Sequence, residues 1–187
     1  GPILLPRGEQ TSWKYNDGAQ APAEGWQSAA YVDAEWKRGK GALGYGERDL
    51  GTTLGFGKDE EDKHMSAYFR TSFRVDPLQR KKLGALGFLL RRDDGAIVYL
   101  NGREVIRSNM APGKVAFTTP AASATGPADE ATYHRYMVPL ESLAKGEVNT
   151  VAIEVHQANP SSSDLFIDLE IIGYLPGEGP RRDIYRE

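Results

Sequence analysis

The 187-residue chain contains no cysteine. This absence excludes disulfides, a thiolate nucleophile and any zinc site with cysteine ligands. It fits a cytosolic protein, and it fits equally an exported bacterial protein that folds without disulfides. The redox compartment therefore stays open.

Long apolar runs and strong net charge are also missing. No segment approaches the roughly 20 apolar residues of a membrane-spanning helix, and no signal peptide is present. Gly1-Pro2 is typical of the scar of a cleaved affinity tag, and on that interpretation the missing signal says nothing about the native location. With 23 basic and 26 acidic residues, the formal net charge is −3. This charge is too mild and too mixed for nucleic acid or an anionic membrane, so we expect neither nucleic-acid binding nor membrane insertion.

Helical periodicity is nearly absent as well. The best candidate, residues 139–146, allows a single turn closed by Gly146. Apolar residues instead alternate with polar ones in short segments rich in Val, Ile, Phe and Tyr, bounded by turn residues. The segments predicted as strands are 11–15, 67–75, 95–102, 133–140, 149–157 and 164–175. Such strands predict an all-β fold, an antiparallel β-sandwich of jelly-roll type. Long loops are predicted at 16–27, 44–63 and 111–131.

The stretch RRDDGAIVYLNGREV contains two neighbouring acids, Asp93 and Asp94. Asp94-Gly95 and Asn101-Gly102 are strong turn dipeptides, and they bound a predicted strand over 96–100. Adjacent residues on extended backbone point to opposite faces, so the two acids are poorly placed to act as an acid/base pair. We interpret the acids as turn formers.

Other catalytic patterns are also missing. His64, His134 and His156 are isolated from one another, without the spacing of a zinc site. His156 lies beside Glu154 and is predicted to be a hydrogen-bonded sheet residue. The glycine-rich segment 44–57 has no nucleotide-binding pattern, and the serines at 161–163 lack a nucleophile elbow. We therefore predict that the chain is not an enzyme, has no catalytic residues and requires no cofactor.

Several motifs follow one another in a recognisable order: SWKY, the DAEW element at 33–36, GKGALGYG, AYFRTSFRV, DDGAIVYLNGREVIRSNM, GEVNTVAIEVHQ and SSSDLFIDLEI. Together they resemble the galactose-binding-like jelly-roll domains appended to secreted bacterial hydrolases, metallophosphoesterases among them. More loosely, they are similar to the sugar-binding jelly roll of family 2 β-galactosidases. The resemblance covers residues 11–175, leaving 1–10 as an N-terminal segment and 176–187 as a linker or tail. It implies a secreted, periplasmic or cell-surface location and a neighbouring domain in the same polypeptide.

The resemblance implies an accessory module that binds carbohydrate or polysaccharide through loops at one end. Other domains of this type are structural or interaction spacers that position an enzyme such as a metallophosphoesterase, so both alternatives stay open; a stand-alone hydrolase is a third. A sugar site needs an aromatic platform and a few polar groups in fixed positions. The platform candidates are Trp26, Trp36 and Tyr45. The polar candidates are Arg92, Asp93, Asp94, His156, Gln157, Asn159 and Asp164. For Trp36 the alternative is a core position, and for Arg92 a solvated side chain.

Many domains of this type carry a structural Ca²⁺. The sequence has no EF-hand spacing, so such a site would be assembled from scattered acids. The candidate ligands are Asp17, Asp33, Asp168 and Glu170. For Asp33 the alternative is a turn cap. The acidic run at 59–62 is predicted to be a solvated loop.

Overall fold

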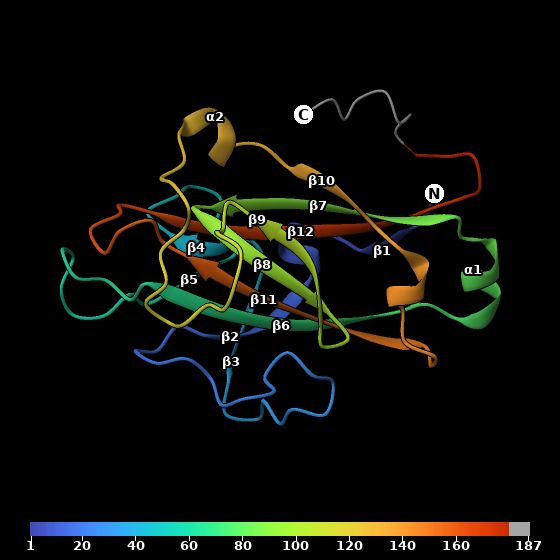
Figure 1. Ribbon diagram of the computed structural model, residues 1–187, viewed down its shortest axis with the longest axis horizontal. Coiled ribbons are helices and arrows are strands. Elements are labelled where there is room, and N and C mark those ends of the chain that lie inside the picture. Colours follow the sequence, from blue (N-terminus) through green and yellow to red (C-terminus); the bar gives the residue numbers. More distant parts are fainter. Residues whose placement is uncertain (180–187) are drawn as a thin grey trace.

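Two six-stranded sheets pack face to face in the computed structural model, which describes residues 1–179 (Figure 1). Sheet A contains β1 (Ile3–Leu5), β4 (Leu43–Tyr45), β5 (Thr52–Thr53), β7 (Ala85–Asp93), β10 (His134–Val138) and β12 (Leu165–Tyr174). Sheet B contains β2 (Ser12–Asn16), β3 (Lys37–Lys40), β6 (Ser66–Arg74), β8 (Gly95–Leu100), β9 (Arg103–Ser108) and β11 (Val148–His156). The strand pairs are antiparallel except for the short pair β4–β5. The predicted all-β antiparallel sandwich is confirmed.

The helices are short: α1 (Pro77–Lys82), α2 (Pro127–Glu130), and the 3₁₀ turns η1 (Gly8–Gln10) and η2 (Leu140–Ser142). The turn predicted at 139–146 is η2. Helix α1 was not predicted; it begins where the Asp76 carboxylate accepts hydrogen bonds from the main-chain N–H groups of Leu78 and Gln79, both at 2.8 Å. Over residues 1–179, no helix is long and apolar enough to cross a membrane.

The core lies between the two sheets and follows the two-residue period of the strands. In β11, the side chains of Val151, Ile153 and Val155 point into the core and are fully buried. Phe69 in β6 and Val98 in β8 lie opposite Ile153 in the sheet and share its face. The alternate positions of the same strands point to the outer face of sheet B, as expected from the alternation.

The outer face of sheet B is itself covered. Residues 17–36, between β2 and β3, and residues 109–126, between β9 and α2, lie over it as long irregular segments. A second apolar cluster forms there, in which Trp26 packs with Tyr68 and Ala152. Sheet B is therefore buried on both faces around β6, β8 and β11.

The stretch around Asp94 differs from its prediction. Strand β7 ends at Asp93 in sheet A, and β8 begins at Gly95 in sheet B, so Asp94 is the crossing point between two sheets and not a hairpin turn. Gly95 is required by close packing, because a Cβ there would lie 2.6 Å from the main-chain oxygen of Asn109. The predicted turn at Asn101-Gly102 is confirmed: both residues have positive φ, 52° and 82°, and they join β8 to β9.

The sandwich also extends beyond the predicted limits at its start. Strand β1 pairs with β12, so sheet A includes residues before the predicted boundary at 11. The predicted tail over 176–187 is exposed from Pro176 to Gly179, and residues 180–187 lie outside the described part of the chain.

Candidate functional site

One end of the sandwich brings together several of the residues predicted for a site. The pairing of His156 with Gly95 places the end of β11 beside the start of β8. The Nε2 atom of Gln157 donates to the hydroxyl of Tyr45 at 2.6 Å and to the main-chain oxygen of Asp164 at 2.7 Å. Loops that are distant in sequence therefore meet at this end.

Asp93 and Asp94 share a hydrogen-bond donor at the crossing between the sheets. The Oγ1 atom of Thr125 lies 2.7 Å from Oδ1 of Asp93 and 3.0 Å from Oδ1 of Asp94. Asp94 also accepts from the main-chain N–H groups of Thr125 and Ala158, each at 2.8 Å. The expectation that the two acids point to opposite faces is wrong, because the chain changes sheet between them instead of continuing as one strand.

Asp93 is the more deeply buried of the two, with 1% of its surface exposed. Burial raises the pKa of its carboxyl to about 8, the Thr125 hydrogen bond acts against this, and the negative charges of Asp94 and Asp164 add to the rise. Its Oδ2 atom has no hydrogen-bond partner. Asp94 is buried as well, with 3% of its surface exposed.

Three further predicted site residues, Tyr45, Arg92 and Asn159, lie close to this end, and each contacts other side chains of the protein. Tyr45 is buried and its ring packs against Phe56 at 5.0 Å, so its face is not available as a platform. Arg92 is 5% exposed, which rules out the solvated alternative, because it lies between the two sheets and donates to Ser108 Oγ at 2.8 Å. Asn159 is exposed and accepts a hydrogen bond from Ser161 at 3.0 Å.

His156 is a hydrogen-bonded sheet residue, as predicted. It is fully buried on the outer face of β11, and its Nε2 atom lies 2.8 Å from Oε1 of Glu154. Its Nδ1 atom faces the main-chain oxygen of Thr119 at 2.7 Å. The histidine therefore joins β11 to the covering segment 109–126.

A pocket of about 510 Å³ opens on the outer face of sheet B. We call it the aromatic pocket; its lining includes Trp26, Tyr68, Tyr99, Phe117, Gln27, Glu104, Arg107, Lys114 and Glu154. The ring of Trp26 meets Tyr68 and Tyr99 edge-on, with centroid distances of 5.1 and 5.6 Å. Trp36 stacks on Trp26 at 6.3 Å and is only half-buried, so it packs on the outer layer and not in the core between the sheets.

Polar groups surround these rings in fixed positions. The guanidinium of Arg107 donates to both carboxylate oxygens of Glu104, at 2.7 and 2.8 Å. The hydroxyl of Tyr99 donates to Glu154 at 3.3 Å, and burial raises the Tyr99 pKa above its ordinary value, with the Glu154 charge adding to the rise. Tyr99 and Glu154 were missed as site residues, although both occupy outward positions of predicted strands.

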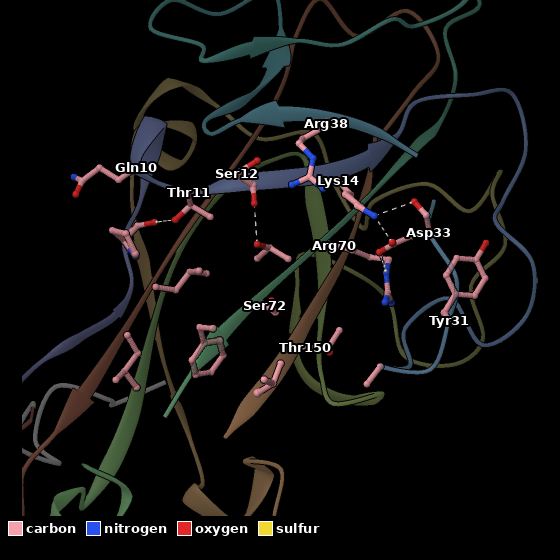
Figure 2. Close-up of a pocket in the computed structure, with 17 residues that line it drawn as sticks. Gln10, Thr11, Ser12, Lys14, Tyr31, Asp33, Arg38, Arg70, Ser72 and Thr150 are labelled. Carbon is pink, nitrogen blue, oxygen red and sulfur yellow. Dashed lines mark hydrogen bonds and ion pairs between the residues drawn. The ribbon is translucent and has the colours of Figure 1, made fainter. Parts of the chain in front are cut away.

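A second hollow, of about 670 Å³, lies beside β2 and β6 (Figure 2). Asp33 lies at its side and accepts from Lys14 Nζ at 2.6 Å and Arg70 Nε at 2.9 Å. Partial burial acts to raise the pKa of Asp33, but the hydrogen bonds and charges of Lys14 and Arg70 outweigh it and lower the pKa. Polar and apolar side chains both line this hollow, and its aromatic lining residues are Tyr31 and Phe73.

The four predicted Ca²⁺ ligands are each engaged elsewhere. Asp17 pairs with Lys37 Nζ at 2.8 Å, and Asp33 pairs with two cations as described. Asp168 accepts from the N–H of Gly8 at 3.0 Å and from the hydroxyl of Tyr133 at 2.7 Å. Glu170 lies 3.6 Å from Arg7. The structure does not bring these four acids together as one set of ligands.

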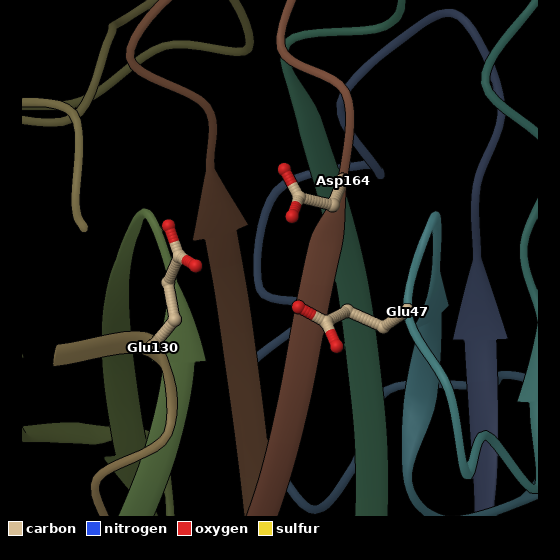
Figure 3. Close-up of side chains that lie close together, drawn as sticks. All are labelled: Glu47, Glu130 and Asp164. Carbon is tan, nitrogen blue, oxygen red and sulfur yellow. The ribbon is translucent and has the colours of Figure 1, made fainter. Parts of the chain in front are cut away.

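A different group of acids does converge, at the end of the sandwich that carries Asp93. The carboxylates of Glu47, Glu130 and Asp164 lie within 4.8 Å of one another and point into a common space (Figure 3). We call these three the acidic trio. They come from the loop after β4, the end of α2 and the loop before β12. Only Asp164 was a predicted site residue; the other two lie in predicted loops without a distinguishing pattern.

No protein-family model and no curated protein matches this chain. Solved structures do resemble it. A β-glycosidase from Bacteroides vulgatus has a TM-score of 0.56 and 14% identity, over 92% of this chain and 20% of that one. A glycosyl hydrolase family 2 member from Bacteroides cellulosilyticus has a TM-score of 0.54 and 15% identity, over 90% and 21%. β-Glucuronidase 2 from Bacteroides uniformis has a TM-score of 0.51 and 15% identity, over 90% and 18%.

At these identities the likeness shows the fold alone. This chain spans about one fifth of the length of the glycosidases it matches. The fold of the chain is thus that of a part of these larger proteins.

Proposed function

We propose that the chain is a non-catalytic, carbohydrate-binding module of a larger exported bacterial protein that acts on carbohydrates. The observation that carries this proposal is the aromatic pocket, in which rings and paired polar groups face one hollow. Sugar rings pack their C–H faces on aromatic side chains, and their hydroxyls bind carboxylates and guanidinium groups of fixed geometry.

The aromatic rings and polar rim residues of the aromatic pocket are arranged in a way that suits sugar binding. Tyr99 and Phe117 are half-buried and offer ring surface to a ligand, while the ring of Trp26, at 5% exposure, packs edge-on against Tyr99. Glu104 and Arg107 supply polar atoms at the rim, and their mutual hydrogen bonds hold them in place before a ligand arrives. A site of this kind loses little side-chain entropy on binding.

The similar solved structures support the proposal that the chain is one part of a larger protein that acts on carbohydrates. The similar proteins are named as glycosidases, and this chain corresponds to about a fifth of each. A neighbouring catalytic domain in the same polypeptide would be the natural partner. The location that fits this role is the periplasm, the cell surface or the extracellular space.

Retention on immobilised polysaccharides and a glycan array test the proposal. We expect the wild-type chain to be retained and Phe117→Ala to lose retention. Tyr133→Ala removes a half-buried aromatic ring that packs under Arg7 and does not line the aromatic pocket, so it is the matched control and should bind like wild type. Failure of the wild type to bind any glycan would exclude the sugar-binding role. Turnover of p-nitrophenyl glycosides or phosphates would overturn the non-catalytic part.

The spacer role is the second candidate, and one observation favours it. A hollow of about 370 Å³ is lined by the apolar residues Pro2, Leu78, Leu83 and Leu175, and Leu78 is 70% exposed. Such a surface suits contact with an adjoining domain. In the full polypeptide, Leu78→Ser would then weaken the packing of the adjoining domain, measured as faster proteolysis between the two, while an unchanged rate would count against a contact here.

A further inference from the structure

A row of three cations crosses neighbouring strands on the outer face of sheet B. Lys14 in β2 lies directly opposite Arg38 in β3 and directly opposite Arg70 in β6. Residues opposite one another in an antiparallel pair point to the same side of the sheet, so the three side chains share one face. Like charges in this position repel one another and destabilise the sheet. A local arrangement that costs stability in this way indicates a functional surface.

The three cations also line the hollow of about 670 Å³ beside β2 and β6, which we call the basic hollow (Figure 2). Among the described residues that line it, Asp33 supplies the single carboxylate. Positive charge is therefore in excess in the basic hollow, although the chain as a whole has a formal net charge of −3. A concave surface with an excess of one sign of charge concentrates ligands of the opposite sign.

Asp33 fixes two of the cations but leaves donors of the row free. Lys14 Nζ donates to Oδ1 of Asp33 at 2.6 Å and to its main-chain oxygen at 3.3 Å, which leaves one of three N–H groups. Arg70 is 5% exposed and donates to Asp33 and to main-chain oxygens of the covering segment 17–36, so it is held in place. Arg38 is exposed and has no hydrogen-bond or ion-pair partner within residues 1–179. Its five N–H donors are available to a ligand.

The uncharged part of the lining favours a sugar over a nucleic acid. Its hydroxyl and amide side chains are Gln10, Thr11, Ser12, Thr71, Ser72 and Thr150. Groups of this kind bind the hydroxyls of a sugar, whereas single-stranded nucleic acids stack successive bases on exposed aromatic faces. Of the two aromatic lining residues, Phe73 is 4% exposed, so Tyr31 alone offers ring surface in the described part of the chain.

We propose that the basic hollow binds an acidic polysaccharide, with a sulfate or carboxylate group of the sugar held between Arg38 and Lys14. An anion in this position offsets the repulsion between the two cations and accepts charge-assisted hydrogen bonds from the free donors of both. The described linings of the basic hollow and the aromatic pocket have no residue in common. The proposal therefore concerns a separate site and does not depend on sugar binding in the aromatic pocket.

The test compares two anionic polymers, dextran sulfate and polygalacturonate, with neutral dextran as the uncharged reference. We expect the wild type to bind at least one anionic polymer at low ionic strength and to lose most of this affinity at about 0.5 M NaCl, because exposed charges are screened by salt. Arg38→Gln and Lys14→Gln should each weaken binding by about three- to fivefold. Arg38→Lys keeps the charge and should lose less than Arg38→Gln.

The melting temperature without ligand shows whether the variants fold. Arg38→Gln should melt no lower than the wild type, because it removes a like charge from the row. Arg48→Gln is the matched control, since Arg48 is an exposed arginine in the loop after β4 and lines neither the basic hollow nor the aromatic pocket. It should bind the anionic polymers like the wild type, and so should Phe117→Ala.

The proposal is overturned if neither anionic polymer binds at low ionic strength, or if neutral dextran binds as tightly as they do. It is also overturned if Arg38→Gln and Lys14→Gln both bind like the wild type. Loss of binding in Phe117→Ala would move the site to the aromatic pocket and overturn it as well. Single-stranded DNA is the last arm: tighter binding than to both polysaccharides, with the same loss in Arg38→Gln, would identify a nucleic-acid site instead.

Discussion

The Nε2 atom of His156 lies 2.8 Å from Oε1 of Glu154, and both side chains are buried on the outer face of β11. The other ring nitrogen, Nδ1, lies 2.7 Å from the main-chain oxygen of Thr119 and 2.9 Å from Ser66 Oγ. The Ser66 hydroxyl donates to the main-chain oxygen of Phe117 at 2.6 Å, so its proton is not directed at the histidine. Serine, histidine and glutamate thus hold a loop in place instead of forming a catalytic triad.

Replacement of His156 by Phe should destabilise the fold by about 2–4 kcal/mol. The change leaves the Glu154 carboxylate buried without its donor and frees the segment around Thr119. Urea unfolding at pH 7 measures the loss. Glu154→Gln, whose amide oxygen still accepts from Nε2, should cost less than half as much. Equal losses in the two variants would contradict the assigned hydrogen bond.

Asp33 should make stability depend on pH in the acid range. Its pKa is lowered in the folded chain by Lys14 and Arg70, against an ordinary value of 3.8. The folded state therefore favours the charged carboxylate, and the stabilisation is present above the unfolded pKa and disappears as the pH falls through the lower folded pKa. Because Asp33 is partly exposed, we expect Asp33→Asn to cost only about 1–2 kcal/mol at pH 7.

Urea unfolding of wild type and Asp33→Asn at pH 7 and at pH 3 tests this expectation. The difference between the two proteins should be largest at pH 7 and should shrink as Asp33 takes up its proton. Asp76→Asn is a control for general acid effects, because Asp76 caps a helix by accepting main-chain N–H groups. A difference for Asp33→Asn that is the same at both pH values would show that the ion pairs are not its cause.

The strands that could be predicted from the sequence are those in which apolar and polar residues alternate clearly. β6, β8 and β11 alternate between core and outer face, and their faces follow directly from the sequence. Strand β7 was missed because it lies in the middle of sheet A with both faces partly covered, and its apolar run lacks alternation. Its Gly87, typical of a turn, is needed because the ring of Tyr174 lies where a Cβ would be, at 2.4 Å.

The candidate site was predictable only in outline. Antiparallel pairing of the strands over 96–100 and 149–157 predicts that segments 93–95 and 156–164 lie at the same end. The structure shows this pairing, with His156 opposite Gly95. Asp93 and Asp94 point to the same donor, Thr125, because the chain passes from one sheet to the other between them. No local sequence pattern predicts the position of this crossing. The aromatic pocket depends on two long irregular segments lying over sheet B, and their path is decided by tertiary contacts such as Trp26 with Tyr99.

Asn101 should be required for both its backbone conformation and its side chain. Its φ is 52°, its Oδ1 accepts from the N–H of Thr150 at 2.9 Å, and its Nδ2 donates to Ser142 and Asn149. Asn101→Ala should cost about 2–3 kcal/mol, since it loses these bonds and makes positive φ unfavourable. Asn101→Gly keeps the backbone conformation and should cost about 1 kcal/mol less. Thermal unfolding of both variants separates the two contributions, and equal melting temperatures would exclude a backbone effect.

Arg107 should influence sugar affinity more than stability. Its guanidinium donates to both oxygens of Glu104, and its Nη1 atom donates to the main-chain oxygen of Ala111 at 2.6 Å. Ala111 begins the stretch that leads to Phe117, so Arg107 holds one wall of the aromatic pocket. A lysine cannot donate to Glu104 and Ala111 at the same time with the geometry of the planar guanidinium. In Arg107→Lys, the segment from Ala111 to Phe117 would therefore have to become ordered when the sugar binds, which costs binding free energy. We expect affinity for the retained glycan to fall by about three- to tenfold.

The accompanying loss of stability should stay below about 1 kcal/mol, because the Arg107–Glu104 pair is partly exposed and the lysine keeps the charge. Isothermal titration with the retained glycan and urea unfolding together separate the two effects. Arg74→Lys is the control: Arg74 is an exposed arginine that is likewise paired with a glutamate, Glu147, but it lies outside the aromatic pocket. If both lysine variants bind the glycan like the wild type, Arg107 does not order the wall. If Arg107→Lys alone weakens binding, the wall between Ala111 and Phe117 is part of the sugar site.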